Sequence, residues 1–427
     1  MSPEVLAFIV LALTIAILAR EILSIGVVGL MLPFVLIALG LSNTETALGY
    51  FVSESVILIP CVYIMSEALL ITGVIDKLGE PIKRIVDKNK KSGESLLLLL
   101  IILMAGIACF FLPRYGVTGV LMPVALAMAR ATKTSRTKLL LVLAMAANIW
   151  GNNTLIATPP NMLANSVLQD SGAATFGFFE FALIGVPIAI GGTLVLTFFG
   201  PRLIPARVKE SDDSGESRKE QSIKVPRAKM ILAIVIFILF ILGIVFSDTI
   251  GIKAHITGMF CVTLVIIFGV LKEKQAYHSV EWGTAFFCAG IQVLGKAIES
   301  SGAGGMIAGF VLRFLGNSPE PILVVAILFI VAGLMTQFMS NTGAAGLLFP
   351  IALSIAVTLG ANPKALVMAV CMGCGSSFMT PMATPSNAMV MENGGILFND
   401  YLKIGAPLMV ATSIICIVGI PMIWPFY

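Results

Sequence analysis

The sequence predicts an all-α, polytopic membrane protein whose two halves form an inverted repeat. Three observations lead to this fold class. Hydrophobic residues make up 58% of the 427-residue chain and charged residues only 12%, whereas soluble domains carry about 25% charged residues. Apolar runs long enough to cross a bilayer recur along the chain. Three short motifs of the first half also return, in the same order, in the second half.

The apolar runs of the first half predict five membrane spans and one re-entrant hairpin. The spans are expected at residues 4–19, 24–41, 53–76, 139–168 and 178–200, and the hairpin at 95–129. The two hairpin arms meet at the polar tip Pro113-Arg114-Tyr115-Gly116, which a lipid-facing helix could not hold. The span at 139–168 is expected to be broken at two polar clusters, WGNNT (150–154) and TPPN (158–161). The basic stretch from Lys77 to Lys91 predicts an interfacial amphipathic helix.

The second half repeats this plan after a polar, charged segment at 201–229, which is interpreted as a cytoplasmic linker. Its spans are expected at residues 230–247, 254–271, 282–301, 365–391 and 400–424, its hairpin at 320–356, and a second interfacial helix at 303–318. The hairpin tip is Ser340-Asn341-Thr342, and the span at 365–391 is broken at GSS (375–377) and ATPSN (383–387). The predicted domains are therefore a first repeat at 1–200, the linker at 201–229, and a second repeat at 230–427.

Three motif pairs carry the evidence of duplication. LMPVA (121–125) matches LFPIA (348–352), ATPPN (157–161) matches ATPSN (383–387), and EFALIGVP (180–187) matches DYLKIGAP (400–407), at offsets of 227, 226 and 220 residues. An odd number of spans in each half inverts the second copy relative to the first, as in many secondary transporters. With both termini external, 22 of the 27 Lys and Arg residues face the cytoplasm, as the positive-inside rule requires. A multi-pass protein of the plasma membrane or bacterial inner membrane is expected.

Broken backbone at membrane depth is tolerated where it lines a cavity, and transporters hold their ions and substrates there. Hydroxyl, amide and exposed carbonyl oxygens suit sodium, while helix amino termini suit a carboxylate or sulfate. The alternative interpretation is that these small polar residues only let helices pack closely. An intramembrane enzyme is not expected, because the chain has two His and lacks a nucleophile–base or metal cluster. No nucleic-acid partner is expected.

The segments MSNTGAAGLLFPIA (339–352) and MATPSNAMVMENGG (382–395) resemble the second half of the divalent anion:sodium symporter family. TLIATPPNML (154–163) resembles the repeated motif of the same family, and the likeness covers nearly the whole chain. The resemblance implies uptake of a dicarboxylate, tricarboxylate or sulfate with sodium as the coupling ion. It also implies an inverted-repeat homodimer with a scaffold domain and a transport domain that moves as an elevator.

The candidate site residues come from the tips and the breaks. The expected sodium ligands of the second half are Ser340, Asn341, Gly343, Thr380, Ala383 and Thr384, to which Thr158 is added from the first half. The expected substrate-binding residues are Arg114, Asn152, Asn153, Thr154, Asn341, Thr342, Ser377, Thr384, Pro385 and Asn387.

Arg114 departs from the family pattern, since many members repeat Ser-Asn-Thr at the first tip. An ionisable residue at membrane depth is costly and is functional by default. It could replace the first sodium as a fixed cation, or it could form a bidentate pair with the substrate. It could also extend to the cytoplasmic interface. Sodium coupling with an altered first site is expected, and anion exchange, proton-coupled anion transport and cation/proton antiport stay open.

Overall fold

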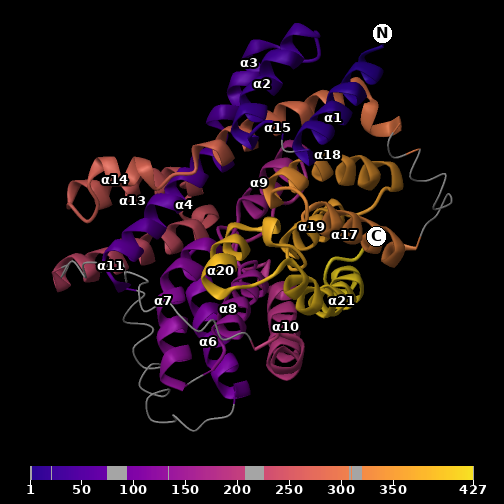
Figure 1. Ribbon diagram of the computed structural model, residues 1–427. Coiled ribbons are helices and arrows are strands. Elements are labelled where there is room, and N and C mark those ends of the chain that lie inside the picture. Colours follow the sequence, from indigo (N-terminus) through magenta and orange to yellow (C-terminus); the bar gives the residue numbers. More distant parts are fainter. Residues whose placement is uncertain are drawn as a thin grey trace.

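The computed structural model describes residues 2–20, 22–74, 94–132, 134–206, 226–306, 309 and 320–426. These residues form helices and connecting segments with no β-strand among them, which confirms the all-α class (Figure 1). The basic stretch at 77–91, residues 207–225 of the expected linker, and most of the expected interfacial helix at 303–318 lie outside the described residues.

The first half contains α1 (Pro3–Ala19), α2 (Ile25–Ala38), α3 (Thr44–Gly49), η1 (Tyr50–Val52), α4 (Glu54–Ile71), α6 (Glu94–Cys109), α7 (Arg114–Thr132), α8 (Arg136–Trp150), α9 (Pro159–Asp170) and α10 (Ala182–Leu203). The arms of the expected hairpin are α6 and α7, which are joined by residues 110–113. The expected broken span is α8 and α9, which are separated by residues 151–158. The apolar runs and the breakers between them therefore located the helices within a few residues.

The second half contains α11 (Arg227–Val245), α12 (Ser247–Ile250), α13 (Ala254–Ile267), α14 (Glu273–His278), α15 (Trp282–Ser301), α17 (Pro321–Met335), α18 (Asn341–Leu359), α19 (Pro363–Gly375), η2 (Pro381–Ala383), α20 (Pro385–Gly394) and α21 (Phe398–Ile423). Local chemistry sets the helix ends around the second tip. The Ser340 hydroxyl accepts the Gly343 N–H at 3.0 Å and caps α18. Gly360 ends α18 with φ +62°, and Asn362 caps α19 ahead of Pro363.

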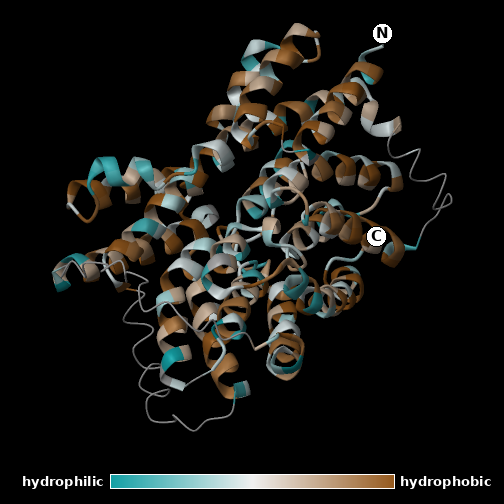
Figure 2. Cartoon of the chain, viewed as in Figure 1, coloured by the Kyte–Doolittle hydropathy of each residue, from teal (hydrophilic) through white to brown (hydrophobic). Residues whose placement is uncertain are grey.

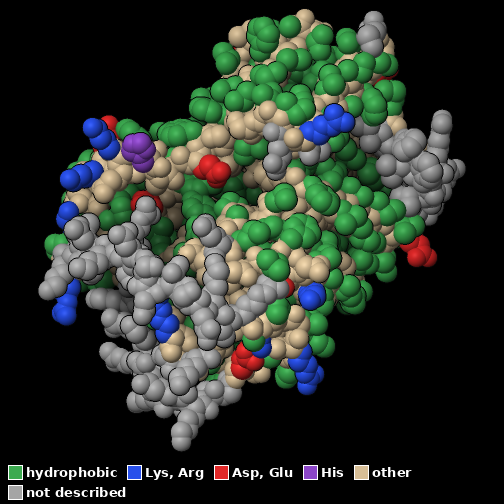
Figure 3. Space-filling view, in the orientation of Figure 1, with side chains coloured by type: hydrophobic (Ala, Val, Ile, Leu, Met, Phe, Trp, Pro, Cys, Tyr) green, Lys and Arg blue, Asp and Glu red, His purple; other side chains and the backbone are tan. Residues whose placement is uncertain are grey.

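The exterior of the molecule is apolar, as a bilayer environment requires. Among the described residues, five helices are long and apolar enough to cross a membrane, at Thr44–Ile71, Ala182–Leu203, Arg227–Val245, Asn341–Leu359 and Phe398–Ile423. Large apolar side chains are exposed on outer helix faces, for example Phe34, 75% exposed on α2, and Val410, 60% exposed on α21. Hydrophobic residues dominate the helices and the visible surface (Figures 2 and 3). Apolar exposure on this scale is typical of a membrane-facing surface.

Helix packing brings the two halves into contact at the breaks. The helix that follows each break packs against the other half, since α9 contacts α18 and α19 while α20 contacts α7 and α8. Helices α2 and α15 pack closely on each other, and a Cβ on Gly290 would overlap the backbone of Gly29. Glycine at this position lets two backbones touch, which is a common way of joining membrane helices.

Candidate transport site

The four polar motifs meet at one cavity of about 370 Å³. Both hairpin tips contribute to its wall through residues 113–115 and 340–342, and both Thr-Pro clusters contribute through residues 157–160 and 382–386. The remaining lining residues are Ile25, Tyr63, Glu281, Thr284 and Ala388. A second cavity of about 240 Å³, between α9, α15 and α18, contains none of the tip or break residues. Because all four motifs line the first cavity, it is the candidate transport site.

Arg114 is the first residue of α7, and its side chain joins the two broken regions. Its Nε donates to the Gly151 carbonyl and its Nη1 to the Gly375 carbonyl, both at 3.2 Å, while Nη2 donates to Asn152 Oδ1. Gly151 follows the last residue of α8, and Gly375 is the last residue of α19, so both carbonyls carry the partial negative charge of a helix carboxyl end. Arg114 is only 6% exposed. The interpretation that it extends to the cytoplasmic interface is therefore wrong.

The polar residues that follow Gly151 lie behind the cavity wall. Asn152 accepts from Arg114 and packs so closely on Gly375 that a Cβ there would overlap it. Asn153 donates to the Trp150 carbonyl at 2.8 Å, and the Thr154 carbonyl accepts from the Asn161 amide at 2.9 Å. None of these residues belongs to the cavity lining. The structure thus places Asn152, Asn153 and Thr154 within the framework of the break.

Four oxygen atoms gather behind the second tip. Asn341 Oδ1 accepts from the hydroxyls of Thr336 at 2.6 Å and Ser377 at 2.8 Å. The same two hydroxyls lie 3.0 and 3.1 Å from the Cys374 carbonyl oxygen. Hydroxyl, amide and carbonyl oxygens are the donor set that hard cations take. Sequence reasoning missed Thr336, which lies in the apolar arm of the hairpin, five positions before Asn341.

The structure places the other expected sodium ligands either in the cavity wall or in hydrogen bonds with neighbouring backbone. Ser340, Ala383, Thr384 and Thr158 line the cavity, and so do Thr342 and Pro385. The Ser340 hydroxyl is already engaged as the cap of α18 through the Gly343 amide. Thr380 donates its hydroxyl to the Gln337 carbonyl at 2.6 Å. Of the expected sodium ligands, Asn341 alone belongs to the four-oxygen cluster. The expected ligands therefore do not form a single group.

Comparison with known proteins identifies the family of the chain. The model of the citrate transporter family matches residues 9–373 and 306–427. The chain belongs to the citrate transporter family. An uncharacterized transporter of Methanocaldococcus jannaschii is 27% identical over 92% of this chain and 88% of its own length. The sodium-dependent dicarboxylate transporter SdcS of Staphylococcus aureus is 24% identical over 78% of this chain and 70% of its own length.

The YdaH transporter of Alcanivorax borkumensis shares the fold, with a TM-score of 0.64 and 15% identity, over 100% of this chain and 99% of that one. The resemblance drawn from the tip and Thr-Pro motifs is thereby confirmed at the level of the family. The family and these relatives are transporters, and the apolar helices make the chain a multi-pass membrane protein.

Three buried amides hold the second break of this transporter together. Asn387 donates to the carbonyls of Ser377 and Thr380 at 3.1 and 2.9 Å. Asn148 on α8 donates to the same Ser377 carbonyl at 3.1 Å and to Asn387 Oδ1 at 2.9 Å. Gln337 donates to the Ser376 carbonyl and accepts the Met379 N–H, both at 2.9 Å. Asn387 is fully buried and lines no part of the cavity, and sequence reasoning missed Asn148 and Gln337. An amide residue within an apolar span was the available signal, because such a side chain needs hydrogen-bond partners when it is buried.

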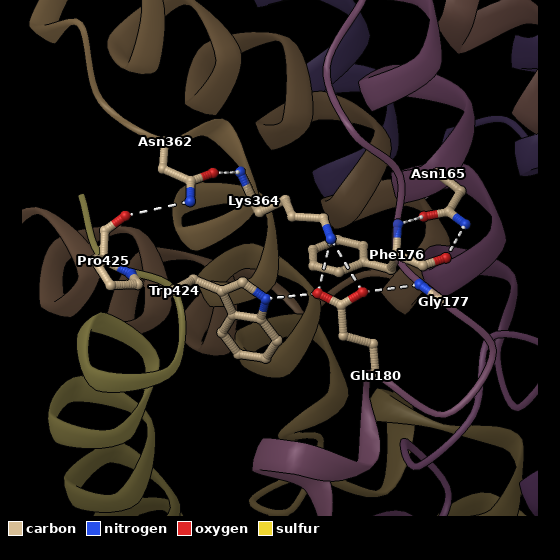
Figure 4. Close-up of polar contacts among 8 residues, drawn as sticks. All are labelled: Asn165, Phe176, Gly177, Glu180, Asn362, Lys364, Trp424 and Pro425. Carbon is tan, nitrogen blue, oxygen red and sulfur yellow. Dashed lines mark hydrogen bonds and ion pairs between the residues drawn. The ribbon is translucent and has the colours of Figure 1, made fainter. Parts of the chain in front are cut away.

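A polar cluster joins the two halves of the transporter (Figure 4). Glu180 accepts from Lys364 at 2.8 and 3.0 Å, from Trp424 Nε1 at 2.7 Å and from the Gly177 N–H at 2.9 Å. Burial alone would raise the pKa of the Glu180 carboxyl, but these hydrogen bonds outweigh it and hold the pKa below its ordinary value. The bond from the Gly177 N–H to Glu180 matches the bond that Asp400 accepts from the Leu397 N–H. The larger role of Glu180 is to tie α19 and the carboxyl-terminal segment to the start of α10.

Proposed function

We propose that the chain is a secondary active transporter for a small divalent anion, a dicarboxylate, tricarboxylate or sulfate. One observation carries this proposal: the helices α7, α9, α18 and α20 begin at Arg114, Pro159, Asn341 and Pro385, and all four residues line the same cavity. Each helix amino terminus contributes partial positive charge and free N–H groups. Four of them converging on one space is a physical basis for holding an anion there.

Sodium is the proposed coupling ion, and we assign it to the second half. Oxygens of the right kind come from Thr336, Asn341, Ser377 and the Cys374 carbonyl. Three cavity-lining residues lie near this cluster along the chain: Ser340 precedes Asn341, and Ala383 and Thr384 follow Ser377. The relative SdcS is named a sodium-dependent dicarboxylate transporter, which supports both the ion and the substrate class. In the first half, the residue equivalent to Asn341 is Arg114, which lies 227 positions earlier in the repeat. There the guanidinium, bonded to the carboxyl ends of α8 and α19, takes the place of the first sodium.

Helix contacts support the proposed inverted repeat of residues 1–200 and 230–427. Several helix contacts have a counterpart under exchange of the halves: α2 with α15 corresponds to α13 with α4, and α9 with α18 corresponds to α20 with α7. We assign the hairpins and broken helices to a transport domain that moves as an elevator against a scaffold of the other spans. The proposed assembly is a homodimer in the cell membrane with both termini external and the linker at 201–229 cytoplasmic.

Uptake into proteoliposomes tests the proposal. Purified protein is reconstituted and offered radiolabelled succinate, citrate or sulfate under an inward sodium gradient, with choline as the control cation. Accumulation of one of these anions that depends on sodium is expected. Uptake only against a preloaded anion, without sodium dependence, would replace symport by exchange. Failure of all three anions under sodium, proton and counter-anion gradients would refute the proposed function.

A further inference from the structure

The carboxyl-terminal half of α9 carries polar residues that contact spans outside the hairpins and the broken helices. Helix α9 packs on α4 and α15 (Figure 1). The Ser166 hydroxyl donates to Gln292 Oε1 on α15, and the two residues are only 5% and 3% exposed. Gln292 also donates to the Cys288 carbonyl of its own helix at 2.7 Å. The Ser166–Gln292 pair is therefore a buried polar contact between α9 and α15.

Two further contacts come from the next turn of α9. Gln169 Nε2 donates to Glu54 Oε1, at the start of α4, at 3.4 Å. Asp170 interacts electrostatically with Tyr50 of η1, and both residues line the second cavity. Residues 166, 169 and 170 lie on one face of the helix, because they are three and four positions apart. One face of α9 is thus joined to α15, α4 and η1.

The second half does not repeat this polar face. The 226-residue offset of the Thr-Pro motifs places Glu392, Gly395 and Ile396 at the equivalent positions. Glycine and isoleucine have no hydrogen-bonding side chain. Among the described residues, α20 packs on α7, α8 and η2, which belong to the hairpins and broken spans themselves. If the inverted repeats exchange their environments between the two end states of transport, the contacts of α9 have weaker counterparts in the opposite state.

We propose that Ser166, Gln169 and Asp170 form a latch, the α9 latch, that holds the transport domain in the conformation of this structure. The proposal rests on the proposed function, because it requires a transport domain that moves against α4, α15 and η1. Each transport cycle breaks the latch as α9 moves away from these elements. One hydrogen bond between membrane helices shifts a two-state equilibrium roughly three- to eighteenfold. The latch therefore sets which side of the membrane the empty cavity faces.

The side from which the transport cavity can be reached measures this equilibrium. Ala388 lies on α20 and lines the cavity, so a cysteine introduced by Ala388→Cys reports access by a membrane-impermeant thiol reagent. Labelling rates are measured in intact cells and in inside-out vesicles, without substrate. The seven native cysteines are buried, and the chain without Ala388→Cys supplies the background.

Loss of the buried pair should change the ratio of the two labelling rates. Ser166→Ala and Gln292→Leu should each shift it roughly three- to eighteenfold toward the side that wild type exposes less. The double variant should shift it no further than the stronger single variant, because the two residues make one contact. Ser354→Ala is the matched control. Its hydroxyl also lies at the second cavity but donates to the Pro350 carbonyl of its own helix at 2.8 Å, so the ratio should stay at the wild-type value.

An unchanged ratio in Ser166→Ala would overturn the inference, and so would an equal rise of both rates, which indicates general loosening. If Ser166→Ala does not fold, Gln169→Ala decides in the same way, because Gln169 is exposed and its loss should shift the ratio about twofold. The labelling requires no transported anion. These failures therefore differ from failure of the proposed function, in which the wild-type protein transports none of the tested anions.

Discussion

Replacement of Arg114 by Asn is the sharpest test of the altered first site. The substitution removes the donors to the Gly151 and Gly375 carbonyls, each 3.2 Å from the guanidinium, and to the Asn152 amide oxygen. A buried acceptor that loses its donor costs about 1–3 kcal/mol. The two carbonyls together therefore predict a loss of about 2–6 kcal/mol in the free energy of unfolding when sodium is absent.

Sodium should recover part of that loss. Asn matches the residue at the second tip, since the 227-residue offset pairs Arg114 with Asn341, and it leaves the two carbonyls without the guanidinium donor, beside an amide oxygen. A sodium ion at 100 times its dissociation constant would stabilise the folded state by about 2.7 kcal/mol. Thermal unfolding in detergent, with sodium chloride compared with choline chloride at equal ionic strength, measures this gain. The variant should respond to sodium more strongly than wild type.

Two further variants separate charge from geometry. Arg202→Asn, at an exposed Arg near the end of α10, should change neither stability nor the sodium response. Arg114→Lys keeps the charge but lacks the planar fork, so it should lose stability without gaining a sodium response. If Arg114→Asn is as stable as wild type in choline and gains nothing from sodium, the fixed-cation assignment is wrong.

Other perturbations test separate parts of the structure. Asn341→Ala should weaken the sodium dependence of uptake about tenfold or more, because it removes the oxygen shared by two hydroxyls. Gly375→Ala should lower the unfolding temperature measurably, because its Cβ would overlap Asn152, whereas Gly49→Ala, with open space around it, should not. Glu180→Gln should lower the free energy of unfolding by about 1–3 kcal/mol at neutral pH. Because the pKa of Glu180 is lowered, wild type should be more stable than Glu180→Gln at pH values above the ordinary pKa of a carboxyl group. This difference in stability should disappear as the pH falls through the lowered pKa.

The helices could be predicted from sequence because apolar runs and breakers act locally. The hairpin expected at 320–356 is α17 and α18, and the break expected near 375–387 is residues 376–384. The meeting of tips and Thr-Pro clusters could also be predicted, since a duplicated motif order implies equivalent positions in the two halves. What sequence could not supply was the partner of each polar side chain.

Packing across the halves decides those partners. Arg114 bonds to Gly375, 261 residues away, and Asn148 bonds to Asn387, 239 residues away. Neither separation leaves a local pattern. Thr336 and Gln337 belong to the hairpin predicted at 320–356, in its apolar first arm. Their partners follow from the surface that α17 presents to its neighbours, which only the folded chain defines.

The asymmetry between the two tips bears on the return step of transport. A sodium ion can leave with the substrate, so a site built from oxygen ligands becomes empty and neutral after release. A guanidinium is part of the chain and stays. Under the proposed function, the empty transport domain therefore retains the charge of Arg114, balanced only by the carboxyl ends of α8 and α19. Moving a net charge through a low-dielectric environment is costly. A second dianion that enters with one sodium ion before the return brings the total charge to zero and lowers that cost. Arg114 therefore favours sodium-dependent exchange beside net uptake, and Arg114→Asn should shift the balance toward net uptake driven by sodium.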